Sequence, residues 1–359
     1  MADVKAYKCL SCKAGLEFDP SSQKWKCHYC FSCFDKEELD AAFGKEELEG
    51  EEQGKTLRES SKGVTSKEKE DLDSYFCSNC GAELIADETT AATFCLYCKN
   101  PSIIKRRFEG EFKPQHIIPF KLTKEQAKDI YKKWMKKHAL APNNFKRKEE
   151  VDKITGIYVP VWLFDSQVQG RIVGQGTKVR SWRQGDYEYI QTKYYEVERE
   201  GYSDYERVPV DGSKKLEDAL VEKIEPYDYK ELKDFNSAYI SGFMAEKYDV
   251  TSGEAQVCME KRVKDFMSSR LEATITEYSS FAAQNKNYEV RDIKAKYAMM
   301  PLYILVNEYK GKMHEFIING QTGRVAGDTP ISFQNQLLYG GKIFLIVVII
   351  MVLGGALFV

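Results

Sequence analysis

The sequence predicts two small β-rich ribbons built around cysteines, then a mixed α+β domain with antiparallel strands and long amphipathic helices, and one C-terminal transmembrane helix. Three observations predict this order: a cysteine pattern that occurs twice, helical and strand-like periodicity through the middle of the chain, and an uncharged apolar segment at its end. A chain of 359 residues is long enough for two or three folding units.

The cysteine pattern is Cys-x2-Cys-x14-Cys-x2-Cys, and its two copies lie 68 residues apart. Four thiolates that converge from two tight knuckles suit the tetrahedral coordination of Zn²⁺. We therefore expect two structural Zn²⁺ ions, with no coordination position left for water. The expected ligands are Cys9, Cys12, Cys27 and Cys30 in the first ribbon, and Cys77, Cys80, Cys95 and Cys98 in the second.

The two ribbons also match at positions other than cysteine, which suggests an internal duplication. The matching pairs are Ala14/Ala82, Leu16/Leu84, Asp19/Asp87 and Tyr29/Tyr97. Modules of this size have little core of their own, so we expect the ribbons to lose structure on zinc removal while the α+β region stays folded.

Eight of the ten cysteines belong to these metal-type knuckles, which need reduced thiols. Cys33 and Cys258 are left over. Cys33 is interpreted as an unpaired cysteine, with a spare metal ligand and a redox-sensitive thiol as alternatives. Cys258 falls in a predicted helix, where a small buried apolar residue is the simplest interpretation.

Residues 343–359 carry no charge or strongly polar group. Their length is at the short end of the roughly 17–25 residues that a helix needs to cross a bilayer. A buried core helix is the alternative. The chain opens without the pattern of a signal peptide. We therefore expect a single-pass protein of the cell membrane with most of the chain in the cytoplasm.

Composition and periodicity give the expected domain boundaries. The segment between the ribbons is charged and has few large apolar residues, so it is interpreted as a flexible linker with a helical stretch at 36–43. We expect ribbon 1 at 5–34, the linker at 35–74, ribbon 2 at 75–102, the α+β domain at 103–330, a juxtamembrane segment at 331–342 and the transmembrane helix at 343–359.

Two capping boxes, which begin at Thr123 and Thr251, predict the two long helices of the α+β domain. Each helix precedes an apolar strand that contains proline and then a hairpin, so a second duplication within 103–330 is suggested. The predicted strands are 157–165, 168–179, 187–197, 297–307 and 313–319, and further helices are predicted at 213–224 and 229–235.

The first of these helices carries six lysines between Lys124 and Lys137 on the face opposite its apolar residues. A solvated basic surface is the ordinary interpretation of such a face. Contact with anionic lipid headgroups is the alternative, which the apolar C-terminal segment favours.

The charge balance argues against a protein that is dominated by binding to phosphate backbones, since 53 basic residues face 55 acidic ones. The sequence contains no H-E-x-x-H, G-x-S-x-G, G-x-G-x-x-G or complete P-loop motif, so we do not expect an enzyme. Asp165 ends an apolar strand and is the one carboxylate singled out, with a role in a turn as the favoured interpretation.

The order of these features resembles a known family. Outside the ribbons, the resemblance is carried by the phrases IIPFKLTKEQA (117–127), GIYVPVWLFD (156–165), TKVRSWRQGDYEY (177–189), VPVDGS (208–213) and INGQTGRVAGD (318–328). The chain resembles the TFIIB-type zinc-ribbon membrane proteins of Gram-positive bacteria, the YdjG-like proteins. Their members are often labelled primosomal-helicase-like because of the ribbons alone.

This resemblance implies a cytoplasm-facing adaptor or scaffold that is anchored in the lipid bilayer by its C-terminal helix. Flotillin-type or phage-shock-type proteins of membrane-stress systems are the implied partners. The alternatives are a nucleic-acid-binding ribbon protein without a helicase motor, and a zinc or redox sensor that uses Cys33. The low basic charge of both ribbons disfavours nucleic acid as a partner.

Overall fold

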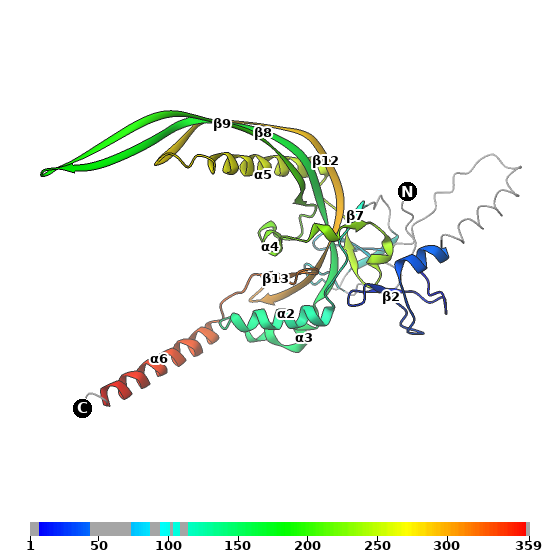
Figure 1. The fold of residues 1–359 in the computed structure, drawn as a ribbon. Coiled ribbons are helices and arrows are strands. Elements are labelled where there is room, and N and C mark those ends of the chain that lie inside the picture. Colours follow the sequence, from blue (N-terminus) through cyan, green and yellow to red (C-terminus); the bar gives the residue numbers. More distant parts are fainter. Residues whose placement is uncertain (1–6, 44–72, 87–93, 101–102, 108–113, 357–359) are drawn as a thin grey trace, which may run out of the picture. The chain divides into compact units, whose positions relative to one another are not determined.

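The computed structural model describes residues 7–43, 73–86, 94–100, 103–107 and 114–356 (Figure 1). The chain forms two compact units. Unit 1 comprises Met1–Pro160, Ser213–Lys247 and Met299–Val359, and unit 2 comprises Val161–Gly212 and Tyr248–Ala298. The expected linker lies mostly outside the described residues, apart from its first part, where residues 36–43 form the predicted helix.

The two units divide the region 103–330, which the sequence suggested to be one domain. The reason is that two strands are far longer than expected: β8 (Thr155–Gln184) and β12 (Ser280–Tyr309) each have 30 residues and belong partly to each unit. The glycines inside β8 allow neighbouring segments to pack closely. At Gly174, for example, a Cβ atom would collide with the carbonyl oxygen of Ala282.

Unit 1 contains most strands of a sheet that, among the described residues, has the order β10-β7-β12-β8-β11-β5-β4-β6. In addition, β9 pairs with β8, β13 pairs with β12, and β14 pairs with β13. Most pairings in this sheet are antiparallel, as expected, but β11 runs parallel to β8. The strand bounds are β4 (Asp73–Cys77), β5 (Glu83–Ala86), β6 (Ile103–Arg107), β7 (His116–Ile117), β10 (Lys233–Asp234), β11 (Met244–Glu246), β13 (Lys312–Asn319) and β14 (Val325–Gly327).

The predicted helix after Thr123 is α2 (Lys124–Lys137), and both hydrogen bonds of its capping box are present. Its buried side chains are Ala127, Tyr131 and Met135. The segment 229–235, predicted as a helix, is instead the 3₁₀ turn η2 (Tyr229–Glu231) followed by β10, because pairing with β7 holds that part extended. Further short helical elements of unit 1 are η1 (Asn143–Lys146), α3 (Lys148–Val151), α4 (Asp218–Ile224) and η3 (Ser237–Ile240).

The core of unit 1 is rich in aromatic rings. Phe120 stacks on Phe243 with ring centroids 4.1 Å apart, and the rings of Tyr158 and Tyr303 lie within 5.0 Å of that of Phe120. All four come from different parts of the sequence, so this cluster joins β8 and β12 to the loops around them.

Unit 2 is a long antiparallel hairpin of β8 and β9 (Tyr187–Asp211), joined by β12 and covered by α5 (Ser252–Glu272). The capping box at Thr251 is present. The helix buries Ala255, Met259, Val263 and Met267 at helical spacing, but Phe266 is 50% exposed. Cys258 is also exposed, contrary to expectation, because it lies away from the strands that α5 covers. The core consists of Phe164, Val168, Ile172, Val208, Ala255, Met259, Val263, Met267 and Leu271.

The C-terminal helix α6 (Phe333–Ala356) begins ten residues before the predicted transmembrane segment, so it includes the expected juxtamembrane residues. Its stretch Phe333–Met351 is long and apolar enough to cross a membrane, and only 6% of that window is buried. The alternative of a buried core helix therefore does not hold for these residues. The start of α6 is attached to unit 1, because the Asn335 side chain donates to the carbonyl oxygen of Ala141 at 2.5 Å.

Candidate metal centres

Each Cys-x-x-Cys knuckle closes on itself through backbone hydrogen bonds. In the first knuckle, the amide of Cys9 donates to Ala14 and the amide of Lys13 donates back to Cys9. The same pair of bonds recurs in the other three knuckles. This geometry needs a left-handed residue at one position, which is filled by Lys13, Phe31, Gly81 and Lys99, all at φ between 57° and 70°. The chain thus accepts non-glycine residues with positive φ to aim the thiols inward.

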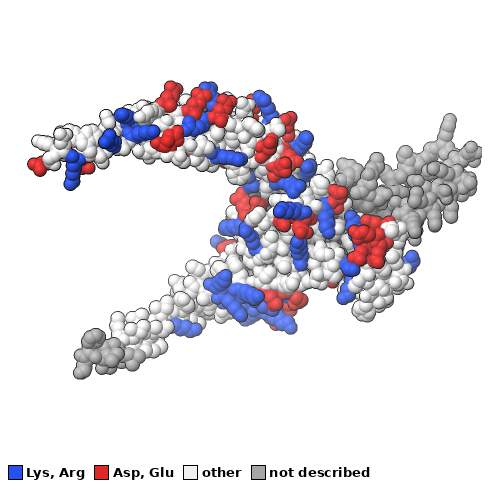
Figure 2. Space-filling view, viewed as in Figure 1, with Lys and Arg blue, Asp and Glu red and all other residues white. Residues whose placement is uncertain are grey.

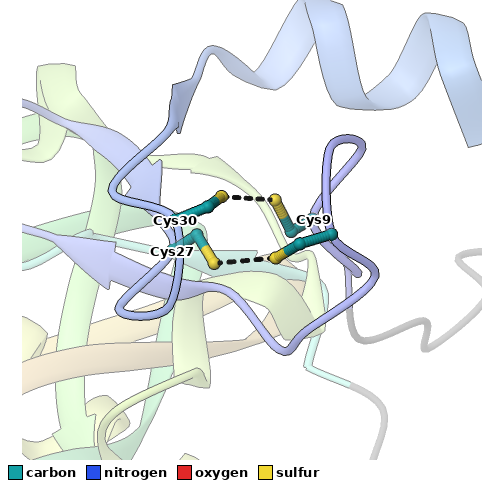
Figure 3. Close-up of side chains that lie close together, drawn as sticks. Cys9, Cys27 and Cys30 are labelled. Carbon is teal, nitrogen blue, oxygen red and sulfur yellow. Dashed lines mark hydrogen bonds between the residues drawn. The ribbon is translucent and has the colours of Figure 1, made fainter.

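The knuckles bring four sulfur atoms together in each ribbon. In ribbon 1 the Sγ atoms of Cys9 and Cys30 are 3.4 Å apart and those of Cys12 and Cys27 are 3.5 Å apart (Figure 3). In ribbon 2 the pairs Cys77–Cys98 and Cys80–Cys95 are both at 3.5 Å. Within each group all four sulfurs lie within 4.8 Å of one another. These are the eight cysteines that the spacing singled out.

The donor sets fit Zn²⁺. A tetrahedron with Zn–S bonds of about 2.3 Å has sulfur–sulfur edges of about 3.8 Å, close to the distances in both groups. The thiols differ in pKa. Burial raises the pKa of Cys95, whereas hydrogen bonds with Ser32 lower the pKa of Cys30 to about 6. Metal would bind all four as thiolates and release their protons. The chain therefore holds two groups of four cysteines that can each bind a metal ion.

Ribbon 1 consists of β1 (Glu17–Asp19), β2 (Lys24–Lys26) and β3 (Cys33–Phe34). It packs on the rest of unit 1 through an aromatic cluster. Trp25 is 1% exposed, and its indole N–H donates to the carbonyl oxygen of Ala238 at 2.9 Å. The ring of Tyr239 lies 5.1 Å from that of Trp25 and 5.2 Å from that of Phe18. Because Trp25 belongs to the ribbon and Tyr239 to η3, the ribbon adds its own side chains to the core of unit 1.

Ribbon 2 is part of the sheet itself. Its strand β5 pairs with β11, so that Leu84 lies opposite Glu246. The hydroxyl of Tyr97 donates to the carboxylate of Glu246 at 2.5 Å, and Ser213 donates to the other carboxylate oxygen at 2.7 Å. Glu246 is only 2% exposed. The sequence did not predict the contact between Tyr97 and Glu246, because the two residues are 149 positions apart.

The two ribbons differ in the surroundings of their second Cys-x-x-Cys knuckle, which begins at Cys27 in ribbon 1 and at Cys95 in ribbon 2. Tyr97 is 6% exposed and bonded to Glu246, whereas Tyr29, its counterpart in ribbon 1, is 85% exposed. Phe31, two residues further along, is 72% exposed. The knuckle of ribbon 2 is thus docked inside unit 1, and the equivalent knuckle of ribbon 1 presents two aromatic side chains to its surroundings.

Comparison with known proteins supports the family that the sequence resembles. No family model matches the chain, and no solved structure matches it. A protein of Bacillus subtilis (strain 168), named Uncharacterized protein YdjG, is 35% identical over 231 residues, which are 64% of this chain and 68% of that protein. The chain belongs to the YdjG-like family. This relative's name supports neither the TFIIB-type label nor the primosomal-helicase label.

In this YdjG-like chain, Cys33 lies outside the sulfur cluster of ribbon 1. Its side chain is exposed, and its Sγ atom approaches the carbonyl oxygen of Phe31 at 3.9 Å. The four ligands of ribbon 1 are complete without it. The geometry therefore gives no support to a spare ligand in this conformation.

Asp165 has a structural role, but it lies within β8 and not at the end of a strand or in the turn that the sequence favoured. It lies at an irregularity in the pairing of β8 with β9, between Phe164 and Ser166. Its carboxylate accepts from the amide of Arg207 at 2.9 Å and from the Lys296 ammonium at 2.8 Å. Burial alone would raise the pKa of Asp165, but these two donors outweigh it and lower that pKa.

The lysines of α2 form a basic surface on unit 1 (Figure 2). Lys128 is paired with Glu125 at 2.7 Å and with Asp152 at 3.0 Å, and Lys132 approaches Asp129 at 3.4 Å. Acidic neighbours thus offset part of this charge, as on an ordinary solvated face. Contact of these lysines with lipid stays a prediction.

Proposed function

We propose that this protein is a membrane-anchored adaptor that faces the cytoplasm, in which ribbon 1 binds a partner protein. The two Zn²⁺ ions are structural, because four cysteines per site leave no position for a reacting ligand. The helix α6 holds the chain in the bilayer. A membrane-stress assembly is the setting that the family resemblance suggests, with flotillin-type or phage-shock-type proteins as candidate partners.

One observation carries this proposal: of the two ribbons, one uses its second knuckle as a docking element within the chain. The second knuckle of ribbon 2 inserts Tyr97 against a buried carboxylate. The same knuckle of ribbon 1 carries Tyr29 and Phe31 exposed. Aromatic residues with a polar tip are enriched at protein interfaces because they combine a large apolar area with a hydrogen bond. The contact of Tyr97 with Glu246 therefore indicates what Tyr29 would meet on a partner protein: an apolar surface with a carboxylate acceptor.

Site-specific photo-crosslinking tests this proposal. A benzophenone amino acid replaces Tyr29 in the full-length chain, and membranes are treated with nuclease before illumination. We expect a discrete crosslinked protein, whose crosslinked peptide lies beside an aspartate or glutamate. Tyr29→Ala should then reduce recovery of that same protein, with the zinc content unchanged.

The matched control places the benzophenone at Tyr202, which is 84% exposed on β9 and belongs to no knuckle. The proposal fails if position 29 gives no protein crosslink, or if it gives the same products as position 202. Crosslinks that form only when the nuclease is omitted would favour the nucleic-acid alternative. Recovery of the protein entirely outside the membrane fraction would remove the anchored part of the proposal.

A further inference from the structure

The far end of the β8–β9 hairpin extends beyond α5 and β12 (Figure 1). Ser279, just before β12, bonds to the carbonyl oxygen of Thr177 at 2.7 Å and to the amide of Val179 at 3.1 Å. The pairing of β8 with β9 continues past this point to a turn in which Gly185 has a φ of 62°. We call residues 178–193 the hairpin tip. An isolated two-stranded β-hairpin is only marginally stable in water unless another surface covers it.

The register assigns the side chains of the hairpin tip to two faces. Residues directly opposite one another lie on the same face, so Trp182 pairs with Tyr189 and Lys178 with Lys193. One face, which we call the cationic aromatic face, therefore carries three basic residues, three aromatic residues, two glutamines and no acidic residue. Its members are Lys178, Arg180, Trp182, Gln184, Tyr187, Tyr189, Gln191 and Lys193.

The aromatic side chains of this face are exposed: Trp182 by 40%, Tyr187 by 72% and Tyr189 by 44%. Trp182 and Tyr189 stack with ring centroids 5.5 Å apart and planes 12° apart. Two of the neighbouring cations lie over aromatic rings, and among the described residues neither forms an ion pair. Lys178 is 5.4 Å from the ring of Tyr195, and Arg180 is 5.9 Å from that of Trp182.

Nearer the body of unit 2, the same hairpin neutralises its charges. Arg171 on β8 pairs with Glu198 on β9 at 2.5 Å. On β12, Arg291 pairs with Glu289 at 2.6 Å. Basic residues without an acidic neighbour on the same face and exposed rings are therefore combined on the cationic aromatic face, whereas the other face of the hairpin tip places Arg183 opposite Glu188. Exposed apolar patches of this kind mark interaction sites.

We infer that the hairpin tip binds the headgroup layer of an anionic bilayer through its cationic aromatic face. Tryptophan and tyrosine are the residues that occupy this layer, because their rings are apolar and their N–H or O–H groups are polar. Lysine and arginine beside them complement the negative lipid phosphates, which favours binding to membranes that carry anionic lipid. The same chain carries a helix that is long and apolar enough to span a membrane, which would tether the chain to a bilayer.

Single-stranded nucleic acid offers phosphates and stacking surfaces as well, so it is the competing ligand. The candidate membrane helix favours the bilayer, since it fixes the protein where lipid headgroups are concentrated. Lipid binding by the hairpin tip and protein binding at Tyr29 are independent, because either can occur without the other.

Tryptophan quenching by brominated lipid tests the inference in the full-length protein. The protein is reconstituted into vesicles of phosphatidylcholine, with or without phosphatidylglycerol, whose acyl chains carry bromine near the headgroup. The chain has four tryptophans, so the signal of Trp182 is the difference between the wild type and Trp182→Phe. We expect the Trp182 emission to be quenched and shifted to shorter wavelength in vesicles with phosphatidylglycerol. The combined variant Arg180→Gln and Lys193→Gln should lose that quenching.

A matched reporter controls for general proximity to the vesicle. Tyr202→Trp in the Trp182→Phe background places an exposed tryptophan on the same strand pair outside the hairpin tip, and it should not be quenched. An unquenched Trp182 in both kinds of vesicle would overturn the inference, as would equal quenching at position 202. Displacement of the tip from anionic vesicles by a short oligothymidine, with tighter binding to that oligonucleotide, would assign the face to nucleic acid instead.

Discussion

Tyr97 and Tyr29 occupy the same position in the two ribbons, but only Tyr97 donates to a buried carboxylate. Tyr97→Phe should lower the free energy of unfolding of unit 1 by about 1–3 kcal/mol, because Glu246 would lose a donor while it stays buried. Tyr29→Phe, the matched control, should change stability by less than about 0.5 kcal/mol. Chemical denaturation of both variants in detergent measures this. Equal effects of the two changes would contradict the docking of ribbon 2.

Asp165 gives a prediction about pH. Its pKa is lowered in the folded state, so its contribution to stability is present above its unfolded pKa of about 3.9 and is lost as the pH falls through the lower folded value. Asp165→Asn should destabilise unit 2 by about 1 kcal/mol at neutral pH, since the carboxylate is partly exposed and screened. The difference in melting temperature from the wild type should shrink below about pH 4. Asp204→Asn, at an exposed position on β9, is the control. A difference that persists unchanged at low pH would be inconsistent with this account.

At the scale of elements, both long helices begin at a capping box. Thr123→Ala should destabilise unit 1, and Thr251→Ala should destabilise unit 2, each by about 1 kcal/mol, because the first turn loses an acceptor for its backbone N–H groups. Serine at either position keeps the acceptor and should restore most of the loss. Hydrogen exchange in the first turns of α2 and α5 provides the measurement. Serine variants as unstable as the alanine variants would show that the side-chain cap is not the cause.

These two helices were predictable because caps and apolar spacing are local signals. Both long strands were predictable only in part. The sequence ended one strand at Asp165 and began the next at Val168, but pairing with β9, which is distant in sequence, continues through this point with only an irregularity. The strand β10 was missed for the same reason, since pairing with β7 outweighs its local preference. A duplication within the α+β region stays a prediction, although α2 precedes β8 and α5 precedes β12 in the expected order.

At the scale of the whole molecule, the eight candidate ligands followed from cysteine spacing alone, and the structure brings them together in two groups of four. The place of the ribbons did not follow from the sequence. They were expected to be separate metal-folded modules, but Trp25 packs among core residues of unit 1 and β5 pairs with β11. Local patterns identify a metal site, whereas the surface on which a small module packs is set by residues such as Tyr239 and Glu246, far along the chain.

This packing changes what zinc removal should do. Because both ribbons contribute to unit 1, loss of zinc should loosen β11 and η3 as well as the ribbons themselves, while α5 and its core in unit 2 stay protected. The sequence alone suggested a loss confined to the ribbons.

The most direct test of this account is hydrogen exchange on the full-length protein in detergent, with zinc counted before and after a chelator. We predict two zinc ions per chain. Once zinc is removed, hydrogen exchange should become faster in residues 237–246 as well as in both ribbons. Exchange in α5 should stay unchanged. A protein without zinc, or exchange that rises in the ribbons alone, would contradict the claim that zinc-bound ribbons are built into unit 1.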